Sequence, residues 1–378
     1  MEDIPFIFGK IPAANNFTNR EKEVRHLMQN FRGLINTIII SPRRWGKSSL
    51  VDHVAERFSG TKSQVKVCRV DLFNVRTEED FYHALAREVL KATSSKWNEV
   101  AENAKAFLSA LVPQISFSPD GQSEITFGIA WDKLKKQTDT ILDLAETIAR
   151  KKKIKIVVCI DEFQSVGEFK NSLAVQRKLR SHWQRHKHVA YCLYGSKRHM
   201  MLDIFTSSSM PFYKFGDLIF LEKIDTPHWI SFIQQRFKDT RKRISENDAR
   251  NIALLADNHP YYVQQLAQQV WLRTSRNCTS EIVDDAYDSL VRQLSLLFTN
   301  TTETLTTTQI NFLKAMLAGE TQFSAQTTLL QYKLGTSANV LRLRKSLEKR
   351  EIIDIVGNTI SFQDPIYRYW LKKYYFAL

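Results

Sequence analysis

Residues Thr37–Val51 read T-I-I-I-S-P-R-R-W-G-K-S-S-L-V. The β-branched run Thr37–Ile40 predicts a short strand that is buried on both faces. Ser41 and Pro42 end this strand, and the apolar spacing within Leu50–Val54 predicts a helix after the loop. The fold is therefore organised around a strand, a tight loop and a helix that follow one another directly.

The loop follows the pattern G-x-x-x-x-G-K-[ST] of a phosphate-binding loop (P-loop), with Ser41, Gly46, Lys47 and Ser48 at its defined positions. Gly46 lets the backbone approach a phosphate, and the N–H groups of the helix N-terminus point at the anion. We expect Lys47 to reach the β- and γ-phosphates of ATP and to act in catalysis there, and Ser48 to bind Mg²⁺. Ser41 stands where the pattern has its first glycine, and serine makes the same turn if its φ is negative. The residues expected to contact nucleotide in this loop are Ser41, Pro42, Arg43, Arg44, Trp45, Gly46, Lys47, Ser48 and Ser49.

A second stretch supports the first. Residues Lys151–Gln164 read K-K-K-I-K-I-V-V-C-I-D-E-F-Q, in which an apolar strand ends at Asp161 and Glu162. In P-loop ATPases the acid at the end of this strand holds Mg²⁺ through water, and the following glutamate polarises the attacking water. Two surface acids after a strand would be the simpler interpretation of this segment alone. The P-loop upstream gives Asp161 a metal-binding role and Glu162 a catalytic one.

Composition bounds the class of protein. The chain has 378 residues, enough for two or three domains, with 43% hydrophobic and 25% charged residues, as is ordinary for a globular protein. Its formal net charge of +14 favours an acidic partner such as nucleic acid, ATP or a membrane surface, without choosing among them.

Four cysteines lie far apart without a C-x-x-C pair, and three of them fall inside apolar runs. They are expected to be reduced core residues. The N-terminus lacks the basic region of a signal peptide, and no apolar run approaches the length of a membrane helix. We therefore expect a cytoplasmic protein with no membrane segment.

Strands that alternate with helices over residues 1–224 predict an α/β doubly wound domain, with a parallel sheet of five strands and its ligand at their carboxyl ends. Residues 91–153 contain an insertion, in which a β-hairpin is expected near 113–129, turning at Pro119–Gly121, and a long helix over 132–150. The arm at residues 1–20 carries Phe6, Phe8 and Phe17, which suit an adenine pocket and packing against the sheet edge equally well.

Helical periodicity over residues 225–300 predicts a small helical lid. Residues 301–308 contain six threonines and are expected to form a linker. Three helices followed by a hairpin at residues 352–362 predict that residues 301–378 are a winged helix-turn-helix.

These motifs resemble those of the archaeal-type ATPase family, a branch of the AAA+/STAND nucleotide-binding proteins, over nearly the whole chain. The matching segments are F-x-N-R-E-x-E-V at Phe17–Val24, S-P-R-R-W-G-K-S-S-L, I-D-E-F-Q, Y-G-S-x-x-x-M, N-H-P-Y-Y and D-P-I-Y-R-Y-W-L at Asp364–Leu371. The resemblance implies that the chain binds ATP with Mg²⁺ in a P-loop ATPase core. It also implies that Ser196 is a catalytic sensor at the end of the fourth strand and that Pro260 lies near the nucleotide base.

Arginines near the site have more than one interpretation. The family's arginine finger is matched by Arg198, Arg180 or Arg185, and the sequence alone does not choose among them. Arg43 and Arg44 either face solvent or stabilise the triphosphate as neighbouring cations.

Two functions fit the resemblance. The first is a nucleotide-dependent molecular switch that hydrolyses ATP to ADP and contacts a protein partner through its winged helix. The alternative is an ATP-controlled protein similar to origin-recognition initiators, whose basic residues Arg342, Arg344, Lys345, Lys349 and Arg350 contact double-stranded DNA.

Charge and composition bear on this choice. Residues 301–378 hold ten Lys/Arg against six Asp/Glu, whereas residues 1–221 hold 34 against 24, so most of the excess positive charge lies outside the winged helix. Asn339 is the only amide side chain on the expected recognition helix. A metabolic kinase is disfavoured because no acceptor-substrate motif is present, and a homo-oligomer is compatible with either function.

Overall fold

The computed structural model describes residues 4–9, 18–59, 64–94, 97–108, 114–117, 125–128 and 138–378. The chain divides into two compact units, one formed by Arg20–Glu222 and the other by Lys223–Leu378 together with the amino-terminal arm. They are called the sheet unit and the helical unit below.

The sheet unit is built on five parallel strands, which confirms the predicted α/β doubly wound architecture. Their order in the sheet is β2-β5-β6-β1-β7. The strands are β1 (Thr37–Ile40), β2 (Val65–Asp71), β5 (Lys155–Asp161), β6 (Val189–Gly195) and β7 (Asp217–Phe220). Because β6 lies between β1 and β5, the loops that follow these three strands meet at the carboxyl edge of the sheet.

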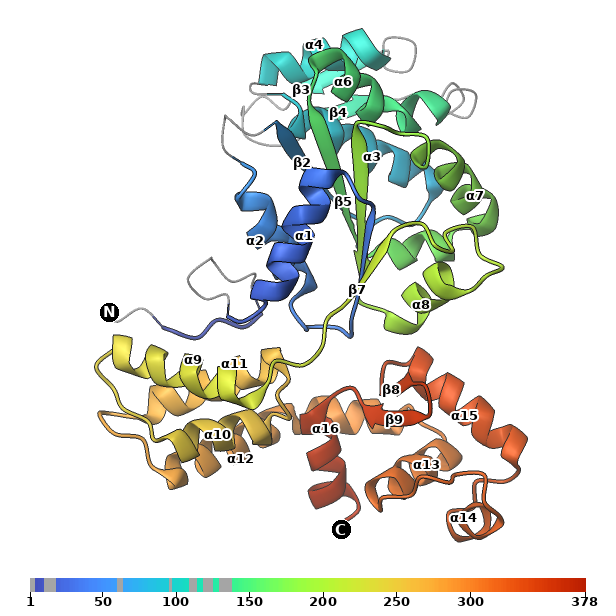
Figure 1. Ribbon diagram of the computed structural model, residues 1–378. Coiled ribbons are helices and arrows are strands. Elements are labelled where there is room, and N and C mark those ends of the chain that lie inside the picture. Colours follow the sequence, from blue (N-terminus) through green and yellow to red (C-terminus); the bar gives the residue numbers. More distant parts are fainter. Residues whose placement is uncertain are drawn as a thin grey trace. The chain divides into compact units, whose positions relative to one another are not determined.

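Helices cover both faces of this sheet (Figure 1). Ile38 and Ile40 of β1 belong to a core shared with one layer of helices, and Ile39, on the opposite face, is equally buried. Burial on both faces explains the continuous apolar runs of these strands. The helices of the unit are α1 (Glu21–Gly33), α2 (Lys47–Glu56), α3 (Glu78–Ala92), α4 (Trp97–Leu108), α6 (Leu144–Lys152), η2 (Phe163–Glu168), α7 (Ser172–Trp183) and α8 (Arg198–Thr206).

The insertion contains the expected hairpin, formed by β3 (Gln114–Phe117) and β4 (Ile125–Gly128). Ile115 pairs with Phe127 and Phe117 pairs with Ile125, as predicted. The turn expected at Pro119–Gly121 lies outside the described residues. The long helix expected over 132–150 is described only from residue 138, and it is interrupted at Asp143, the residue before α6.

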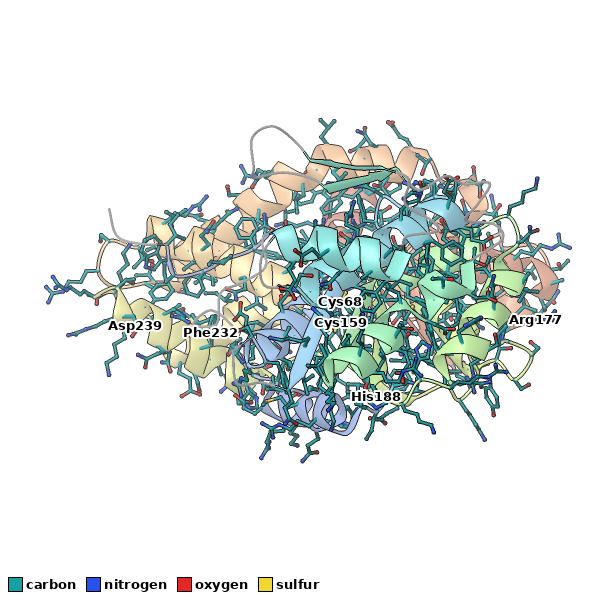
Figure 2. All side chains as sticks on the ribbon, turned by 90° about the horizontal axis from the view of Figure 1, so that it is seen from above. Cys68, Cys159, Arg177, His188, Phe232 and Asp239 are labelled. Carbon is teal, nitrogen blue, oxygen red and sulfur yellow. The ribbon has the colours of Figure 1, made fainter. Side chains whose placement is uncertain are left out.

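The cysteines of the sheet are core residues, as expected. Cys68 and Cys159 lie on the adjacent strands β2 and β5, in the interior of the unit (Figure 2). Cys192 pairs with Cys159 across β5 and β6, and all three are buried free thiols. Burial raises the pKa of the Cys68 and Cys159 thiols well above its ordinary value, so both side chains stay protonated and unreactive.

The helical unit has a single apolar core that joins the expected lid to the carboxyl-terminal segment. Its elements are α9 (Thr226–Asp239), α10 (Glu246–Leu255), α11 (Pro260–Arg273), α12 (Ser280–Glu303), α13 (Thr307–Leu317), α14 (Gln326–Gln331), α15 (Ser337–Lys349), β8 (Ile353–Val356), β9 (Thr359–Phe362), α16 (Pro365–Trp370) and the π-helix η3 (Leu371–Tyr375). The order α13, α14, α15 and then the β8–β9 hairpin is the one expected of a winged helix-turn-helix. Phe6 of the arm is buried in this core, and Gln268 Nε2 donates to the Phe6 carbonyl oxygen at 2.9 Å.

The prediction of a linker at residues 301–308 is wrong for most of these residues. Helix α12 continues to Glu303, and α13 begins at Thr307. Thr301 and Thr302 fit a helix because each hydroxyl donates to the carbonyl oxygen four residues earlier, at 2.8 Å. Thr302 is also buried, and its hydroxyl contacts the Tyr367 hydroxyl at 2.8 Å. Thr306 forms a capping box with Gln309 at the start of α13.

No helix among the described residues is long and apolar enough to cross a membrane.

Candidate nucleotide-binding site

The P-loop begins at Ser41, directly after β1. Ser41 is buried and has a negative φ, so the serine makes the turn as predicted. The left-handed conformation falls instead on Arg44, with φ of 63°, and on Gly46, with φ of 91°. A Cβ on Gly46 would meet no atom within 4 Å, so the left-handed backbone is the reason for glycine at this position. Helix α2 starts at the next residue, with its N–H groups directed into the loop.

The Lys47 ammonium lies inside the curve of the loop. Its Nζ donates to the Pro42 carbonyl oxygen at 2.9 Å, and to the Ser41 carbonyl oxygen and Oγ at 3.3 and 3.4 Å. Lys47 is only 5% exposed. Neutral oxygens therefore hold a buried cation at the N-terminus of α2, where helix dipole and ammonium together favour an anion.

Ser48 and Asp161 meet across the sheet, 113 positions apart in the chain. The Ser48 hydroxyl donates to Asp161 Oδ2 at 2.7 Å. Burial raises the pKa of Asp161 to about 6, although the hydrogen bond from Ser48 opposes this shift. A carboxylate that is destabilised by burial gains most from a nearby cation. A hydroxyl and a carboxylate are also the oxygen ligands that Mg²⁺ accepts, so these two residues fit the expected metal.

Glu162 is turned toward β6 by its backbone. Its φ is 54°, and its N–H donates to Asp161 Oδ1 at 2.8 Å. Its Oε2 accepts a hydrogen bond from Ser196 Oγ at 2.8 Å and another from the Ser196 N–H at 3.3 Å. Two of the three residues predicted to act in catalysis, Glu162 and Ser196, are therefore in direct contact, because β6 ends beside β5.

Sequence reasoning missed Gln164. Its Nε2 also donates to Glu162 Oε2, and its side chain lies against Gly195, where an added Cβ would overlap Gln164 Oε1. The only signal in the sequence is a polar residue two positions after the glutamate in an otherwise apolar segment, F-Q-S-V.

The structure separates the three arginine-finger candidates. Arg198 follows Ser196 at the carboxyl edge of the sheet and begins α8. Arg185 and Arg180 lie near the end of α7, which leads back to the amino end of β6, so both are toward the opposite edge. Arg180 Nη1 also donates to the Tyr213 carbonyl oxygen at 3.3 Å, and its guanidinium stacks over Phe215.

The other residues that were expected to contact the nucleotide do not all belong to the same unit. Arg43 and Arg44 are exposed on the outer side of the P-loop, and Trp45 and Ser49 are half-buried. Pro260 is the first residue of α11 in the helical unit, so its place beside the nucleotide base stays a prediction. The described residues contain no cluster of three or more His, Cys, Asp or Glu that could hold a metal.

Comparison with known proteins bears on the family and the fold of the chain. A family model described as an ATPase domain predominantly from Archaea matches residues 17–266. The Walker-type ATPase PABY2304 of Pyrococcus abyssi has a similar structure, with a TM-score of 0.66 at 15% identity, covering 95% of this chain and 97% of that chain. The ORC2 protein of Aeropyrum pernix, in its ADPNP–ADP complexes, has a TM-score of 0.60 at 14% identity, covering 97% and 94%. At these identities the likeness shows a shared fold.

No curated protein matches the chain. The family model, however, spans well over half of the residues and includes the P-loop, the Asp161-Glu162 pair and Ser196. The chain therefore belongs to the family of P-loop ATPases found predominantly in Archaea.

Proposed function

We propose that this protein binds ATP with Mg²⁺ at the P-loop, hydrolyses it to ADP and phosphate, and acts as a nucleotide-dependent molecular switch of the AAA+/STAND type. The observation that carries the proposal is the pair of hydroxyl–carboxylate contacts at the carboxyl edge of the sheet. Ser48 contacts Asp161 at 2.7 Å, and Ser196 contacts Glu162 at 2.8 Å. These contacts support the proposal that Ser48 and Asp161 bind the metal beside Glu162 and Ser196, at the edge where β1, β5 and β6 end.

Each residue has a separate task in this proposal. Lys47 and the N–H groups of α2 bind the β- and γ-phosphates, in place of the loop carbonyls that now accept from the ammonium. Ser48 and Asp161 would hold Mg²⁺, which supplies positive charge to the phosphates when bound. Glu162 orients the attacking water and accepts its proton, and Ser196 contacts the γ-phosphate or this water. Of the three arginine-finger candidates, Arg198 is the one that we assign to this role, because it lies at the same edge of the sheet as the P-loop.

The switch part of the proposal rests on where the expected phosphate contacts lie. Lys47, Glu162 and Ser196 all belong to the sheet unit. Loss of the γ-phosphate on hydrolysis would remove contacts with these residues, and a protein partner would then recognise one of the two nucleotide states. The free thiols accord with a cytoplasmic location.

The test uses two variants with opposite expectations. Lys47→Ala should abolish ATP binding in calorimetry with Mg²⁺, because it removes the cation that meets the β- and γ-phosphates. Glu162→Gln should bind ATP as tightly as the wild type and lose hydrolysis in a single-turnover assay, because only the proton acceptor is gone. Unchanged ATP affinity in Lys47→Ala would contradict the P-loop assignment, and equal turnover in Glu162→Gln would remove Glu162 from the reaction.

A second candidate function is ATP-controlled binding of double-stranded DNA, and one observation favours it. Arg342, Lys345 and Lys349 are all exposed, and their spacing places them on one face of α15. Such a face suits phosphate contacts. Asn339, however, donates its amide Nδ2 to the Leu334 carbonyl oxygen at 2.8 Å, so the only amide of the helix is engaged within the protein. We therefore rank the switch with a protein partner first.

Fluorescence anisotropy with a labelled duplex across a salt series distinguishes the two functions. If α15 binds DNA, the double variant Arg342→Ala/Lys345→Ala should lower the slope of log affinity against log salt by about two, and ATP affinity should stay unchanged. Absence of binding at low salt, with and without ATP, would rule out the DNA-binding function.

A further inference from the structure

We propose that Gln164 is the positioning residue for Glu162: it anchors one carboxylate oxygen so that the other faces the attacking water. This inference rests on the proposed ATP hydrolysis and adds to it a residue that holds the catalytic carboxylate in place. Gln164 lies in η2, the short helix directly after the acidic pair, and is 3% exposed.

Three hydrogen bonds converge on a single oxygen of Glu162. The donors to Oε2 are Gln164 Nε2, the Ser196 hydroxyl and the Ser196 N–H. Among the described residues, none donates to the other oxygen, Oε1. A carboxylate held in this way cannot rotate about its last bond without breaking all three contacts, and Oε1 keeps its lone pairs for a water molecule. Glu162 is therefore pre-oriented as a proton acceptor.

The orientation of the Gln164 amide follows from its partner. Glu162 Oε2 is an acceptor, so the NH₂ group must face it, and the reversed amide would bring two oxygens together. The consequence is that Gln164 Oε1 is buried without a hydrogen-bond partner among the described residues. An unsatisfied buried oxygen is unfavourable, so the amide makes its contact with Glu162 at a cost to the stability of the fold.

Gly195 provides the space that this placement needs. A Cβ at Gly195 would overlap Gln164 Oε1 and lie 3.0 Å from its Cδ. Gly195 has no positive φ, so backbone conformation does not explain the glycine. The last residue of β6 is small because the Gln164 side chain occupies the position of its missing side chain. The contact between Gln164 of η2 and Glu162, which follows β5, thus depends on Gly195 of β6.

In the reaction, the oxygen of water bonds to the γ-phosphorus, and the bond from this phosphorus to the oxygen shared with the β-phosphate breaks. Glu162 Oε1 takes one proton from the water. This proton is then released together with the phosphate product. Gln164 contacts neither the water nor the phosphates. Its effect is on the fraction of time for which Oε1 points at the water, so its loss should lower kcat and leave ATP binding intact.

The first experiment compares Gln164→Leu with the matched control Gln176→Leu. Leucine has a similar volume. Gln176 is also a buried glutamine of the sheet unit whose Oε1 lacks a hydrogen-bond partner in the described part of the chain. It lies on α7, whereas the donors to the Glu162 carboxylate are Gln164 and Ser196. We expect Gln164→Leu to lower single-turnover kcat by about 10- to 100-fold, with KM for ATP changed by less than about threefold. Its melting temperature should not fall, because a buried unsatisfied oxygen is removed. Gln176→Leu should keep the wild-type kcat.

The second experiment is a double-mutant cycle with Gly195→Ala. The methyl group should displace Gln164 and lower kcat as much as Gln164→Ala does. In the Gln164→Ala background the nearest remaining contact is Met201 Sδ at 3.1 Å, at the flexible end of a side chain. The added methyl should then cost no further activity. If the two residues acted separately, their effects on kcat would multiply instead.

The outcomes separate this inference from the proposed function. If Glu162→Gln turns over as fast as the wild type, the proposed hydrolysis is wrong and the inference falls with it. If Glu162→Gln is inactive while Gln164→Leu keeps the wild-type kcat, the hydrolysis stands and the role of Gln164 is wrong. A drop in kcat that is matched by the Gln176→Leu control, or multiplicative effects in the cycle, would assign Gln164 to packing alone.

Discussion

The substitution Asp161→Asn should make the nucleotide-free protein more stable while it removes the response to Mg²⁺–ATP. Burial holds the pKa of Asp161 at about 6, compared with an ordinary value of 3.8. A shift of roughly two units corresponds to about 3 kcal/mol, and we reduce this to about 2 kcal/mol because part of the carboxyl group faces solvent. Asparagine removes the buried charge. Its amide oxygen can still accept from the Glu162 N–H, and its NH₂ group can donate to the Ser48 hydroxyl oxygen.

The sign of the pH dependence follows from proton binding. Between pH 3.8 and about 6 the folded protein binds a proton at Asp161 more tightly than the unfolded chain does. The free energy of unfolding therefore falls as pH rises through this window. The stability gained by Asp161→Asn should be near zero at about pH 4 and should reach about 2 kcal/mol above about pH 7.

Urea unfolding, followed by circular dichroism without nucleotide, measures this difference. The matched control is Asp71→Asn, at the register position of Asp161 on the neighbouring strand but exposed to solvent. Comparison with this variant separates the effect of burial at Asp161 from the effect of replacing an exposed aspartate at the same register position. Addition of Mg²⁺–ATP should raise the melting temperature of the wild type and not that of Asp161→Asn. A stability gain that does not change with pH, or a loss at neutral pH, would refute the reasoning.

Three further predictions concern other parts of the sheet unit. Ser196→Ala should lower kcat about tenfold or more with little change in KM for ATP, and an equal loss of affinity would make Ser196 a binding residue. Burial alone would raise the pKa of Asp143, but hydrogen bonds from His186 and His182 hold it below its ordinary value. Asp143→Asn should therefore destabilise the protein by at most about 1 kcal/mol at neutral pH, in unfolding curves that converge with the wild type as pH falls below the pKa of Asp143. Arg198→Ala should reduce single-turnover hydrolysis more than Arg185→Ala does, and the reverse order would move the arginine finger to α7.

The P-loop was predictable from local sequence because its geometry is local. The buried strand, the glycine with a left-handed backbone and the helix start all lie within Thr37–Val51, and the structure places them as expected. The five-stranded parallel sheet followed from the alternation of apolar strands with amphipathic helices. The local pattern gave a wrong prediction at the expected linker. Thr301 and Thr302 belong to a helix there, because their hydroxyls donate to carbonyl oxygens of the same helix.

Tertiary structure decided which distant residues meet. Ser48 and Asp161 are far apart in the chain, and Glu162 meets Ser196 only because β6 lies beside β5 in the sheet. Gln164 had no role in the sequence, because a glutamine in an apolar segment does not reveal its partner. The requirement for glycine at position 195 comes from a side chain 31 positions earlier in the chain. Sequence thus determined the elements through local periodicity and backbone preference. The order of the strands, which depends on long-range packing, determined which of the proposed site residues are in contact.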